Sequence, residues 1–323
     1  MAFPGTGKIW MNGSFVDWGD ARIHVASHVI HYGSAVFEGA RCYQTAQGPA
    51  CFRLEPHMRR LIDSARVYRM DPPYTEQQLT DAVLDTIRVN GFNHCYIRPL
   101  IYRGYDSLGV FAAACPIDVA VLVWEWGTYF TKEALEQGLD VKVSTWARMA
   151  PNTLPAMAKC VANYANSQLI AMEARLEGYA EGIALDTNGT ISEGSGQNVF
   201  VVRNGIIYTP PLASSVLWGI TRDSAMTIAR DLGFEVREEV LPRELLYLAD
   251  EVFFVGTAVE ITPIRSVDKI KVGRGSRGPI TAAIQQRFQD LVSGRAPDTH
   301  GWLTYVNSSA AVREPASIGA KGR

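Results

Sequence analysis

The sequence predicts a protein of the α+β/α/β class with a small N-terminal α+β domain and a larger C-terminal domain. The chain has 323 residues, and at roughly 100–200 residues per domain this length suits one large domain or two ordinary ones. Stretches with the two-residue period of strands and stretches with the 3.6-residue period of helices occur in both halves. A polar connection over 127–138 separates them. We expect domains over 1–126 and 139–307, and a disordered tail over 308–323.

The composition is globular and excludes several functional classes. Apolar residues make up 47% of the chain and charged residues 20%, which argues against disorder. Lys and Arg number 31 against 33 Asp and Glu, so we expect no nucleic-acid partner. We find no apolar run of membrane-spanning length and no secretory signal. The five cysteines are widely spaced without a Cys-x-x-Cys motif, which predicts reduced thiols, a cytoplasmic location and no zinc site.

The N-terminal half is expected to contain two helices among several strands. Thr75 and Gln78 form a capping-box pattern at the start of the second helix, and Gly91 follows its end. Pro56 suits the first position of the first helix, whose apolar side chains recur at 58, 61, 62 and 65. The expected strands are a hairpin over 8–15 with its turn at Asn12-Gly13, then 35–43, 50–54, 95–102 and 117–126.

The C-terminal half is expected to mix short strands with three helices. Pro151 and Pro155 exclude a helix before about Met157. The expected helices cover 157–178 with apolar spacing at 165, 169, 172 and 176, then 221–232 with Thr221 as N-cap and 225, 228, 229 and 232 inward, then 279–294. The expected strands include 141–145 and 250–255, with turns at 187–189 and 203–205.

Lys159 is the only charged residue between Pro151 and Asn166. A lysine in such surroundings either extends to the surface or is buried. Burial would lower its pKa and make the neutral amine nucleophilic, which is what Schiff-base chemistry requires. A surface lysine at a helix start remains the alternative.

Three further segments suggest a ligand site. Glu193 stands among small residues in Ile-Ser-Glu-Gly-Ser-Gly, so a planar ligand could approach the backbone closely and its ring nitrogen could pair with the carboxylate. Gly219 leads into the helix at Thr221, where free N–H groups favour an anion. Gly256-Thr257-Ala258 offers a second set of N–H groups at a strand end. A solvated loop, a plain capped helix and a simple strand exit are the respective alternatives.

Two arginines are candidates for binding anions. Arg59 lies beside apolar helix positions, and we expect its neighbour Arg60 on the surface. Arg98 shares a strand face with Tyr96, which brings a guanidinium and a phenol together; an exposed strand face is the alternative. His24, His28 and His31 have helical spacing but no acidic neighbour in a β-prone segment, so we predict no metal site.

Together these segments resemble the fold-type IV pyridoxal-phosphate aminotransferases, and among them the branched-chain amino acid aminotransferases. The resemblance extends from about Ile9 to Val306 and implies a barrel-like mixed sheet flanked by helices in the C-terminal domain. The segments that carry it are 31–41, 96–100, 150–155 with Lys159 and Tyr164, 181–186, 191–194, 219–223, 247–252 and 256–263.

The resemblance implies a residue set for the cofactor, pyridoxal 5'-phosphate. Lys159 would be the catalytic residue, as Schiff-base lysine and proton shuttle. Glu193 would keep the pyridine nitrogen protonated, and Tyr164 would bind the phenolic oxygen. The implied cofactor-binding residues are Arg59, Lys159, Tyr164, Glu193, Leu217, Gly219, Ile220, Thr221, Gly256 and Thr257.

The resemblance also implies the substrates, which are Leu, Ile or Val and 2-oxoglutarate with its product glutamate, in a ping-pong reaction. The α-carboxylate would bind the N–H groups of Thr257 and Ala258, and Arg98 the distal carboxylate. The implied substrate-binding residues are Tyr32, Phe37, Gly39, Tyr96, Arg98, Val110, Trp126, Tyr129, Thr257 and Ala258. Relatives supply part of this pocket from a second subunit, so a homodimer or a larger assembly of dimers is implied.

Other reactions of the same fold remain open from sequence. Arg103-Gly104 resembles relatives that act on D-amino acids or (R)-amines, and an aminodeoxychorismate lyase is a further alternative. The pair Tyr96 and Arg98 argues against both. A non-catalytic pyridoxal-phosphate carrier would not need an intact substrate-side set of residues.

Overall fold

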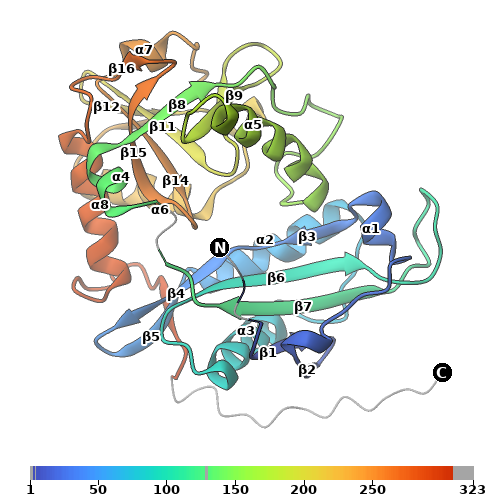
Figure 1. Ribbon diagram of the computed structural model, residues 1–323. Helices are drawn as coiled ribbons and strands as arrows, with labels where there is room; N and C mark the ends of the chain where they lie inside the picture. The colour runs from blue at the N-terminus through green and yellow to red at the C-terminus, as the bar shows by residue number, and fades with distance from the viewer. Residues whose placement is uncertain (1–2, 4, 128–129, 308–323) are drawn as a thin grey trace. The chain divides into compact units, whose positions relative to one another are not determined.

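The computed structural model describes residue 3, residues 5–127 and residues 130–307, which form two compact units (Figure 1). Unit 1 is the chain up to Trp126 together with the chain from Asp298, and unit 2 is Gly127–Pro297. The chain returns to unit 1 before the expected end at 307, because β17 (Leu303–Tyr305) pairs with β5 (Gly48–Phe52). The expected tail over 308–323 lies outside the described residues.

Unit 1 is built on one antiparallel sheet in the order β17-β5-β4-β6-β7-β1-β2, with β3 also paired to β6 (Figure 1). The hairpin expected at Asn12-Gly13 is present, and both residues have positive φ, as a tight hairpin turn requires. The expected strand over 35–43 is split in two at Glu38 and Gly39. The other strands are β1 (Lys8–Met11), β2 (Ser14–Asp17), β3 (Ala35–Phe37), β4 (Ala40–Thr45), β6 (Cys95–Arg103) and β7 (Ile117–Trp124).

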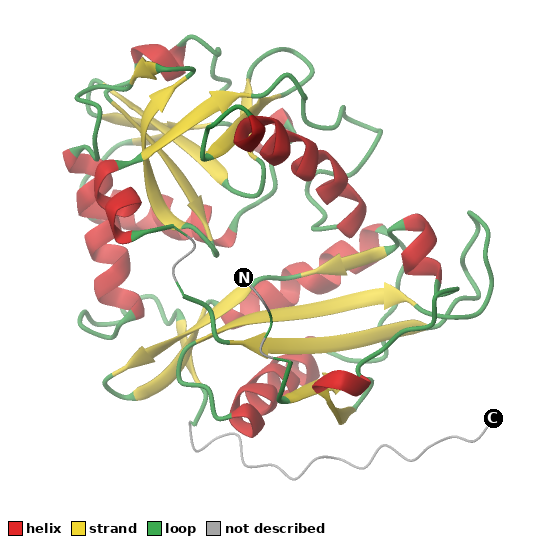
Figure 2. Cartoon of the chain, viewed as in Figure 1, coloured by secondary structure: helices red, strands yellow, loops and turns green. Residues whose placement is uncertain are grey.

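Helices α2 (Leu54–Val67) and α3 (Glu76–Asn90) contact each other and the sheet of unit 1 (Figure 2). The capping box between Thr75 and Gln78 is present, and Gly91 ends α3 in the left-handed conformation, as predicted. Helix α2 begins at Leu54, two residues earlier than Pro56 suggested, because Arg53 adopts a left-handed turn at its N-cap. Two short elements precede them: the 3-10 helix η1 (Trp18–Asp20) and α1 (His28–Tyr32). The segment expected to be β-prone, residues 23–28, forms no strand, and α1 begins at its last residue.

Unit 2 contains a closed, barrel-like mixed sheet. Its strands follow the order β10-β9-β8-β15-β14-β11, and β10 pairs with β11 to close the ring. Strand β8 runs parallel to both of its neighbours, and the other pairs of the ring are antiparallel. The strands are β8 (Leu139–Val143), β9 (Glu181–Leu185), β10 (Ile191–Gly194), β11 (Asn198–Arg203), β12 (Ile206–Thr209), β13 (Val236–Glu238), β14 (Glu251–Gly256), β15 (Glu260–Val267) and β16 (Ile270–Lys271).

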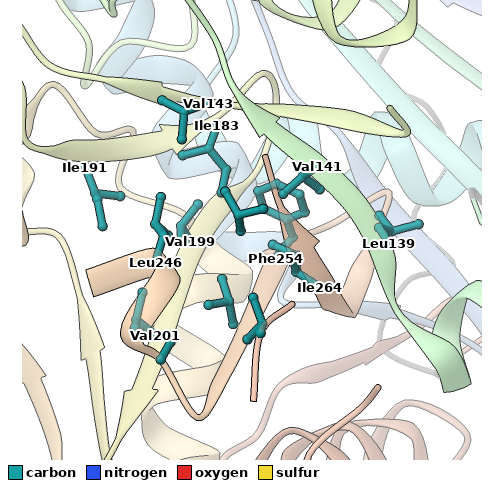
Figure 3. Close-up of a cluster of buried hydrophobic side chains, with 14 of the residues drawn as sticks. Leu139, Val141, Val143, Ile183, Ile191, Val199, Val201, Leu246, Phe254 and Ile264 are labelled. Atoms are coloured by element: carbon teal, nitrogen blue, oxygen red, sulfur yellow. The ribbon is translucent and has the colours of Figure 1, made fainter. Parts of the chain in front are cut away.

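The strands of this ring and α7 (Leu245–Leu248) contribute side chains to an apolar cluster. Figure 3 shows Val141, Ile183, Val199 and Phe254 directed toward one another from different strands. Neighbouring residues of a strand point to opposite faces, so β8 supplies Leu139, Val141 and Val143 to this core, and β11 supplies Val199 and Val201.

Unit 2 also contains four longer helices: α4 (Lys132–Gln137), α5 (Tyr164–Leu176), α6 (Ile220–Asp231) and α8 (Pro279–Val292). Helix α4 lies within the segment expected as a plain connection, and Thr131 caps it. The N-cap of α6 is Gly219 and not Thr221, and Leu232, which we expected inside, is the exposed C-cap residue. Two 3-10 turns accompany these helices, η2 (Val161–Asn163) and η3 (Leu212–Ser214).

Helix α5 begins at Tyr164, seven residues later than Met157, so the prediction for its start was wrong. It presents Ile170 and Ala174 to β9, where Gly182 lets the helix approach closely. The apolar residues predicted to face inward do share one face of the helix, but this face is exposed and lies away from β9. These residues are Ala165, Leu169, Met172 and Leu176.

We expect Phe254→Ala to lower the free energy of unfolding by about 3–5 kcal/mol, because it leaves a cavity among fully buried side chains. Urea unfolding of the purified protein measures this change. The control Leu248→Ala removes an exposed apolar side chain of α7 and should change stability by no more than about 0.5 kcal/mol. Equal losses for the two variants would contradict the assigned core.

Candidate active site

Lys159 lies in a turn before α5 and not on the helix. Its Nζ donates to the Tyr164 hydroxyl at 2.6 Å and lies 5.1 Å from the centre of that ring. The Asn163 side chain fixes the turn by donating to the carbonyls of Pro155 and Ala158. These bonds place the half-buried lysine amine beside a phenol.

Glu193 on β10 is a buried carboxylate with three donors. Arg148 Nη2 donates to Oε1 at 2.8 Å, while Asn198 Nδ2 and the Leu217 amide donate to Oε2 at 3.0 and 3.1 Å. Burial raises the pKa of Glu193, and the charge of Arg148 opposes this effect. An acidic group held this way can stabilise a positive charge on a neighbouring ring nitrogen, because the buried surroundings strengthen the attraction.

The segment from Leu217 to Thr221 joins this carboxylate to the start of α6. Asn198 donates to the Leu217 carbonyl at 3.0 Å as well as to Glu193. A Cβ at Gly219 would collide with the Asn198 side chain, so glycine is required for this close approach. The first amides of α6, at Ile220 and Thr221, have no acceptors within their own helix, which makes this end of the helix suitable for an anion.

Strand β14 ends at Gly256, and a turn through Thr257 and Ala258 leads to β15. Gly256 pairs with Glu260 across this turn. Thr257 and Ala258 are both partly exposed. Their N–H groups and the Thr257 hydroxyl can therefore serve as donors to a bound carboxylate or phosphate.

In unit 1, the Arg98 guanidinium lies among aromatic rings. Its central carbon is 4.5 Å from the Phe37 ring centre, 5.4 Å from that of Tyr96 and 5.9 Å from that of Trp124. Arg98 Nη2 donates to the Tyr96 hydroxyl at 3.4 Å, and its buried Nε has no hydrogen-bond partner among the described residues. Trp126 lies near Tyr96 with 4.8 Å between ring centres. A half-buried cation in such a setting can bind a carboxylate.

The two neighbouring arginines of α2 differ in burial, and the surface position predicted for Arg60 was wrong. Arg60, which we expected on the surface, is buried and donates to Glu38 at 2.5 and 2.8 Å. The Arg59 side chain is 67% exposed and forms an ion pair with Asp63 at 3.4 Å. The apolar stripe of the helix did not reveal this, because Glu38 on a distant strand segment selects which arginine faces inward.

The remaining candidates of unit 1 lie mostly on exposed segments. Tyr32 on α1 and Val110 in the loop between β6 and β7 are exposed, and Val110 is 92% so. The buried His28 bonds to Ser34 Oγ and to the Gly109 carbonyl, which anchors this loop. Gly39 is buried. Tyr129 lies outside the described residues.

Arg103, which kept the D-amino acid and (R)-amine alternatives open, has a structural role here. Its guanidinium is buried and donates to the carbonyls of Ala112, Tyr68 and Arg69. This side chain is therefore occupied by backbone acceptors. No group of three or more His, Cys, Asp or Glu residues in the described ranges is arranged to hold a metal ion, and none of the helices there is long and apolar enough to cross a membrane.

Three residues of these sites were not predicted from the sequence. Arg148 and Asn198 hold Glu193, and Trp124 lies beside Arg98. Asn198 is close to Glu193 in sequence and could have been considered. Arg148 is 45 positions away from Glu193, and only the folded barrel shows the contact.

Unit 2 combines a closed mixed barrel with a lysine amine beside a phenol and a buried carboxylate on a barrel strand. These features are the ones that the sequence segments predicted for a fold-type IV aminotransferase. The sequence matches the Amino-transferase class IV family over residues 35–267, and the chain belongs to this family. Its fold is therefore the fold-type IV aminotransferase fold that the sequence segments predicted.

Within this family, the chain is similar to branched-chain-amino-acid aminotransferases. The chain is 53% identical to the branched-chain-amino-acid aminotransferase of Escherichia coli K12 over 300 residues, which is 93% of this chain and 97% of that protein. The Pseudomonas aeruginosa enzyme of that name is 42% identical over the same shares. The crystal structure of the E. coli enzyme has a TM-score of 0.92 at 53% identity and covers 94% of this chain and 100% of that one. The Thermobaculum terrenum enzyme in its PLP form has a TM-score of 0.87 at 34% identity, with coverage of 94% and 99%.

Helix α5, which begins with Tyr164, is tied to β8 through Glu173. This carboxylate accepts hydrogen bonds from Lys142 Nζ and Ser144 Oγ, each at 2.6 Å, and from the Thr145 amide at 3.1 Å. Burial opposes the ionisation of Glu173, but these donors outweigh it and lower its pKa to about 2. The ionised form is therefore the one that the folded protein stabilises.

We expect the stability supplied by Glu173 to depend on pH. Because its pKa in the folded state lies below its ordinary value of 4.5, the contribution is complete above about pH 5 and is lost as the pH falls toward 2. The free energy of unfolding of Glu173→Gln should therefore approach that of the unchanged protein as the pH falls from about 5 toward 2. Urea unfolding across pH tests this. The control Glu177→Gln removes the half-exposed partner of the same lysine and should show a smaller pH-dependent difference; equal differences would contradict the assignment.

Proposed function

We propose that this protein transfers amino groups between branched-chain L-amino acids and 2-oxoglutarate, using pyridoxal 5'-phosphate. Its relatives at 53 and 42% identity are named for this reaction, and the Thermobaculum terrenum structure is of the PLP form. The single observation that carries the proposal is the 2.6 Å contact between Lys159 Nζ and the Tyr164 hydroxyl in the unit whose barrel also holds Glu193.

The donor set of unit 2 fits a phosphorylated pyridine ring. Glu193 supplies a buried carboxylate for a ring nitrogen, Tyr164 a phenol for a ring oxygen, and Lys159 an amine for an aldehyde carbon. The cofactor, when bound, supplies an electron sink for the bonds at the substrate α-carbon. Leu217, Gly219, Ile220, Thr221, Gly256 and Thr257 are proposed to line this site.

Within this proposal, the residues of the cofactor site have separate roles. Lys159 moves a proton through its Nζ, since the Tyr164 hydroxyl contact and the turn that Asn163 fixes hold its amine in place. Glu193 holds the proton on the ring nitrogen, and Arg148 keeps Glu193 oriented. The amides of Ile220 and Thr221 bind phosphate oxygens.

We propose that Arg59 adds a cation for the phosphate. The structure leaves its guanidinium exposed, and its ion pair with Asp63 is long at 3.4 Å. An exposed guanidinium of this kind can offer two parallel donors to a phosphate dianion. The role itself rests on the resemblance of the surrounding sequence to that of the family.

The substrate residues are proposed to serve two kinds of side chain in turn. The amides of Thr257 and Ala258 bind the α-carboxylate that both kinds share. Arg98 binds the distal carboxylate of glutamate, which the aromatic setting and the orphaned Nε support. Branched alkyl groups contact the apolar side chains instead, and the proposed residues for this pocket are Tyr32, Phe37, Gly39, Tyr96, Val110, Trp126 and Tyr129.

We propose a homodimer, or an assembly of dimers, as the working form. The exposed apolar face of α5 at Leu169, Met172 and Leu176 supports it, as do Val110 and Phe111 at 92% and 90% exposure. Monomeric proteins rarely expose apolar groups of this extent without a partner. A cytoplasmic location is proposed as well, because all five cysteines are free and buried.

We expect Lys159→Ala to lower the turnover of L-leucine with 2-oxoglutarate by roughly three orders of magnitude or more, because both the covalent attachment and the proton shuttle are lost. Steady-state assays of the purified holoenzyme measure this. The control Lys271→Ala removes an exposed lysine of the same unit and should retain turnover. Substantial turnover by Lys159→Ala would reject the proposed function.

Arg98→Ala should weaken L-glutamate binding about thirtyfold or more, since losing one partner of a buried charge pair costs roughly 2 kcal/mol or more. The L-leucine half-reaction should change much less, because its side chain carries no distal charge. Single-turnover spectra of each half-reaction separate the two effects. Arg98→Lys, which keeps the cation, should show a smaller loss for L-glutamate; equal losses for both substrates would remove Arg98 from the proposed site.

A further inference from the structure

A buried carboxylate, that of Glu38, lies at a break in the sheet of unit 1 beside Arg98. Strands β3 and β4 keep one register along β6 but break at Glu38 and Gly39, opposite Pro99 and Arg98. Pro99 has no N–H group, so the Glu38 amide donates to the Pro99 carbonyl at 2.9 Å without a return bond. The backbone at this point therefore depends on support from outside the strand ladder.

Helix α2 provides this support through the Glu38 side chain. Arg60 donates to Oε1 and Oε2 at 2.5 and 2.8 Å, and His57 Nδ1 lies 2.7 Å from Oε2. The Gly39 amide donates to the same Oε2 at 3.2 Å. Burial opposes the ionisation of Glu38, but the charges of Arg60 and His57 outweigh it and hold the pKa of the carboxyl well below its usual range. The carboxylate thus joins the strand break to two turns of a helix.

The chain neighbours of Glu38 both lie close to groups that contact Arg98. The Phe37 ring lies 4.5 Å from the guanidinium carbon of Arg98. A Cβ at Gly39 would collide with the Tyr96 hydroxyl, which accepts the hydrogen bond from Arg98. A shift of this peptide segment would therefore displace both groups that fix the guanidinium.

We propose that Glu38, held by Arg60 and His57, is a positioning residue that fixes the Arg98 guanidinium for the second carboxylate of a dicarboxylic substrate. Glu38 is fully buried, so it acts through Phe37 and Gly39 and does not touch the substrate. It sets the selectivity between dicarboxylic and branched apolar substrates. This inference rests on the proposed role of Arg98.

The experiment compares half-reactions of purified holoenzyme carrying Glu38→Gln. The apparent dissociation constant of L-glutamate should rise about ten- to a hundredfold, because a small misplacement of a binding group has effects of this size. The limiting rate at saturation and the L-leucine half-reaction should change little. Arg60→Lys keeps the positive charge but loses the paired donors, so it should shift the glutamate-to-leucine ratio in the same direction by less.

Glu251→Gln is the matched control. Glu251 is also a buried carboxylate, but it binds the Ile280 and Thr281 amides at the start of α8 in unit 2. Its loss should lower the melting temperature without changing the glutamate-to-leucine ratio. If Glu38→Gln and Glu251→Gln shift this ratio equally, the positioning role is overturned.

The experiment also tests the positioning role if a variant does not fold. If Glu38→Gln yields no folded holoenzyme, the ratio for Arg60→Lys decides, and an unchanged ratio overturns the inference. If neither variant folds, the carboxylate serves the fold as a whole and the specific role is rejected. Arg98→Ala separates the two proposals. If Arg98→Ala selectively weakens L-glutamate binding but Glu38→Gln and Arg60→Lys do not, only the positioning role is rejected. If Arg98→Ala causes no selective loss of L-glutamate binding, the assigned carboxylate site itself is rejected.

Discussion

The buried carboxylate of Glu193 is the constraint around which the site of unit 2 is organised. A buried carboxylate is costly unless donors surround it. Its donors come from the segment before Lys159, from β11 and from the segment that leads into α6, through Arg148, Asn198 and Leu217. One charge therefore fixes the relative positions of three chain segments, and two of them lead directly to the lysine turn and to the helix N-terminus.

Unit 1 also contains a buried glutamate that is held by an arginine, but here the pair supports the backbone of a sheet. Glu38 and Arg60 form a buried ion pair that closes a gap in the strand ladder created by Pro99. Breaking a pair of this kind leaves an uncompensated charge inside, which is why both members are needed even where the pair adds little net stability. In each unit, a second basic group lies near the buried glutamate and arginine. In unit 2, the charge of Lys159 acts on Glu193. In unit 1, the Arg98 guanidinium lies over the ring of Phe37, the residue before Glu38.

Local sequence was informative where local interactions decide the structure. The Asn12-Gly13 turn and the capping box at Thr75 depend on residues within a few positions, and both were predicted. The helix start at Met157 was predicted wrongly, because the bonds of Asn163 to Pro155 and Ala158 hold the chain in a turn there. The exposure of the apolar stripe on α5 was not predicted either. Periodicity gives the spacing of apolar residues along a helix but not whether the rest of the protein covers them.

The sequence by itself determined the class of the protein, because Lys159, Tyr164, Glu193 and their flanking motifs occur in an order and spacing that few folds share. It also determined most strands and helices, which follow from turn chemistry and apolar period. Only the tertiary structure decided which charged side chains turn inward: Arg60 and not Arg59, and Arg148 beside Glu193. Burial of a charge depends on a partner brought from elsewhere in the chain, and no local pattern specifies that partner.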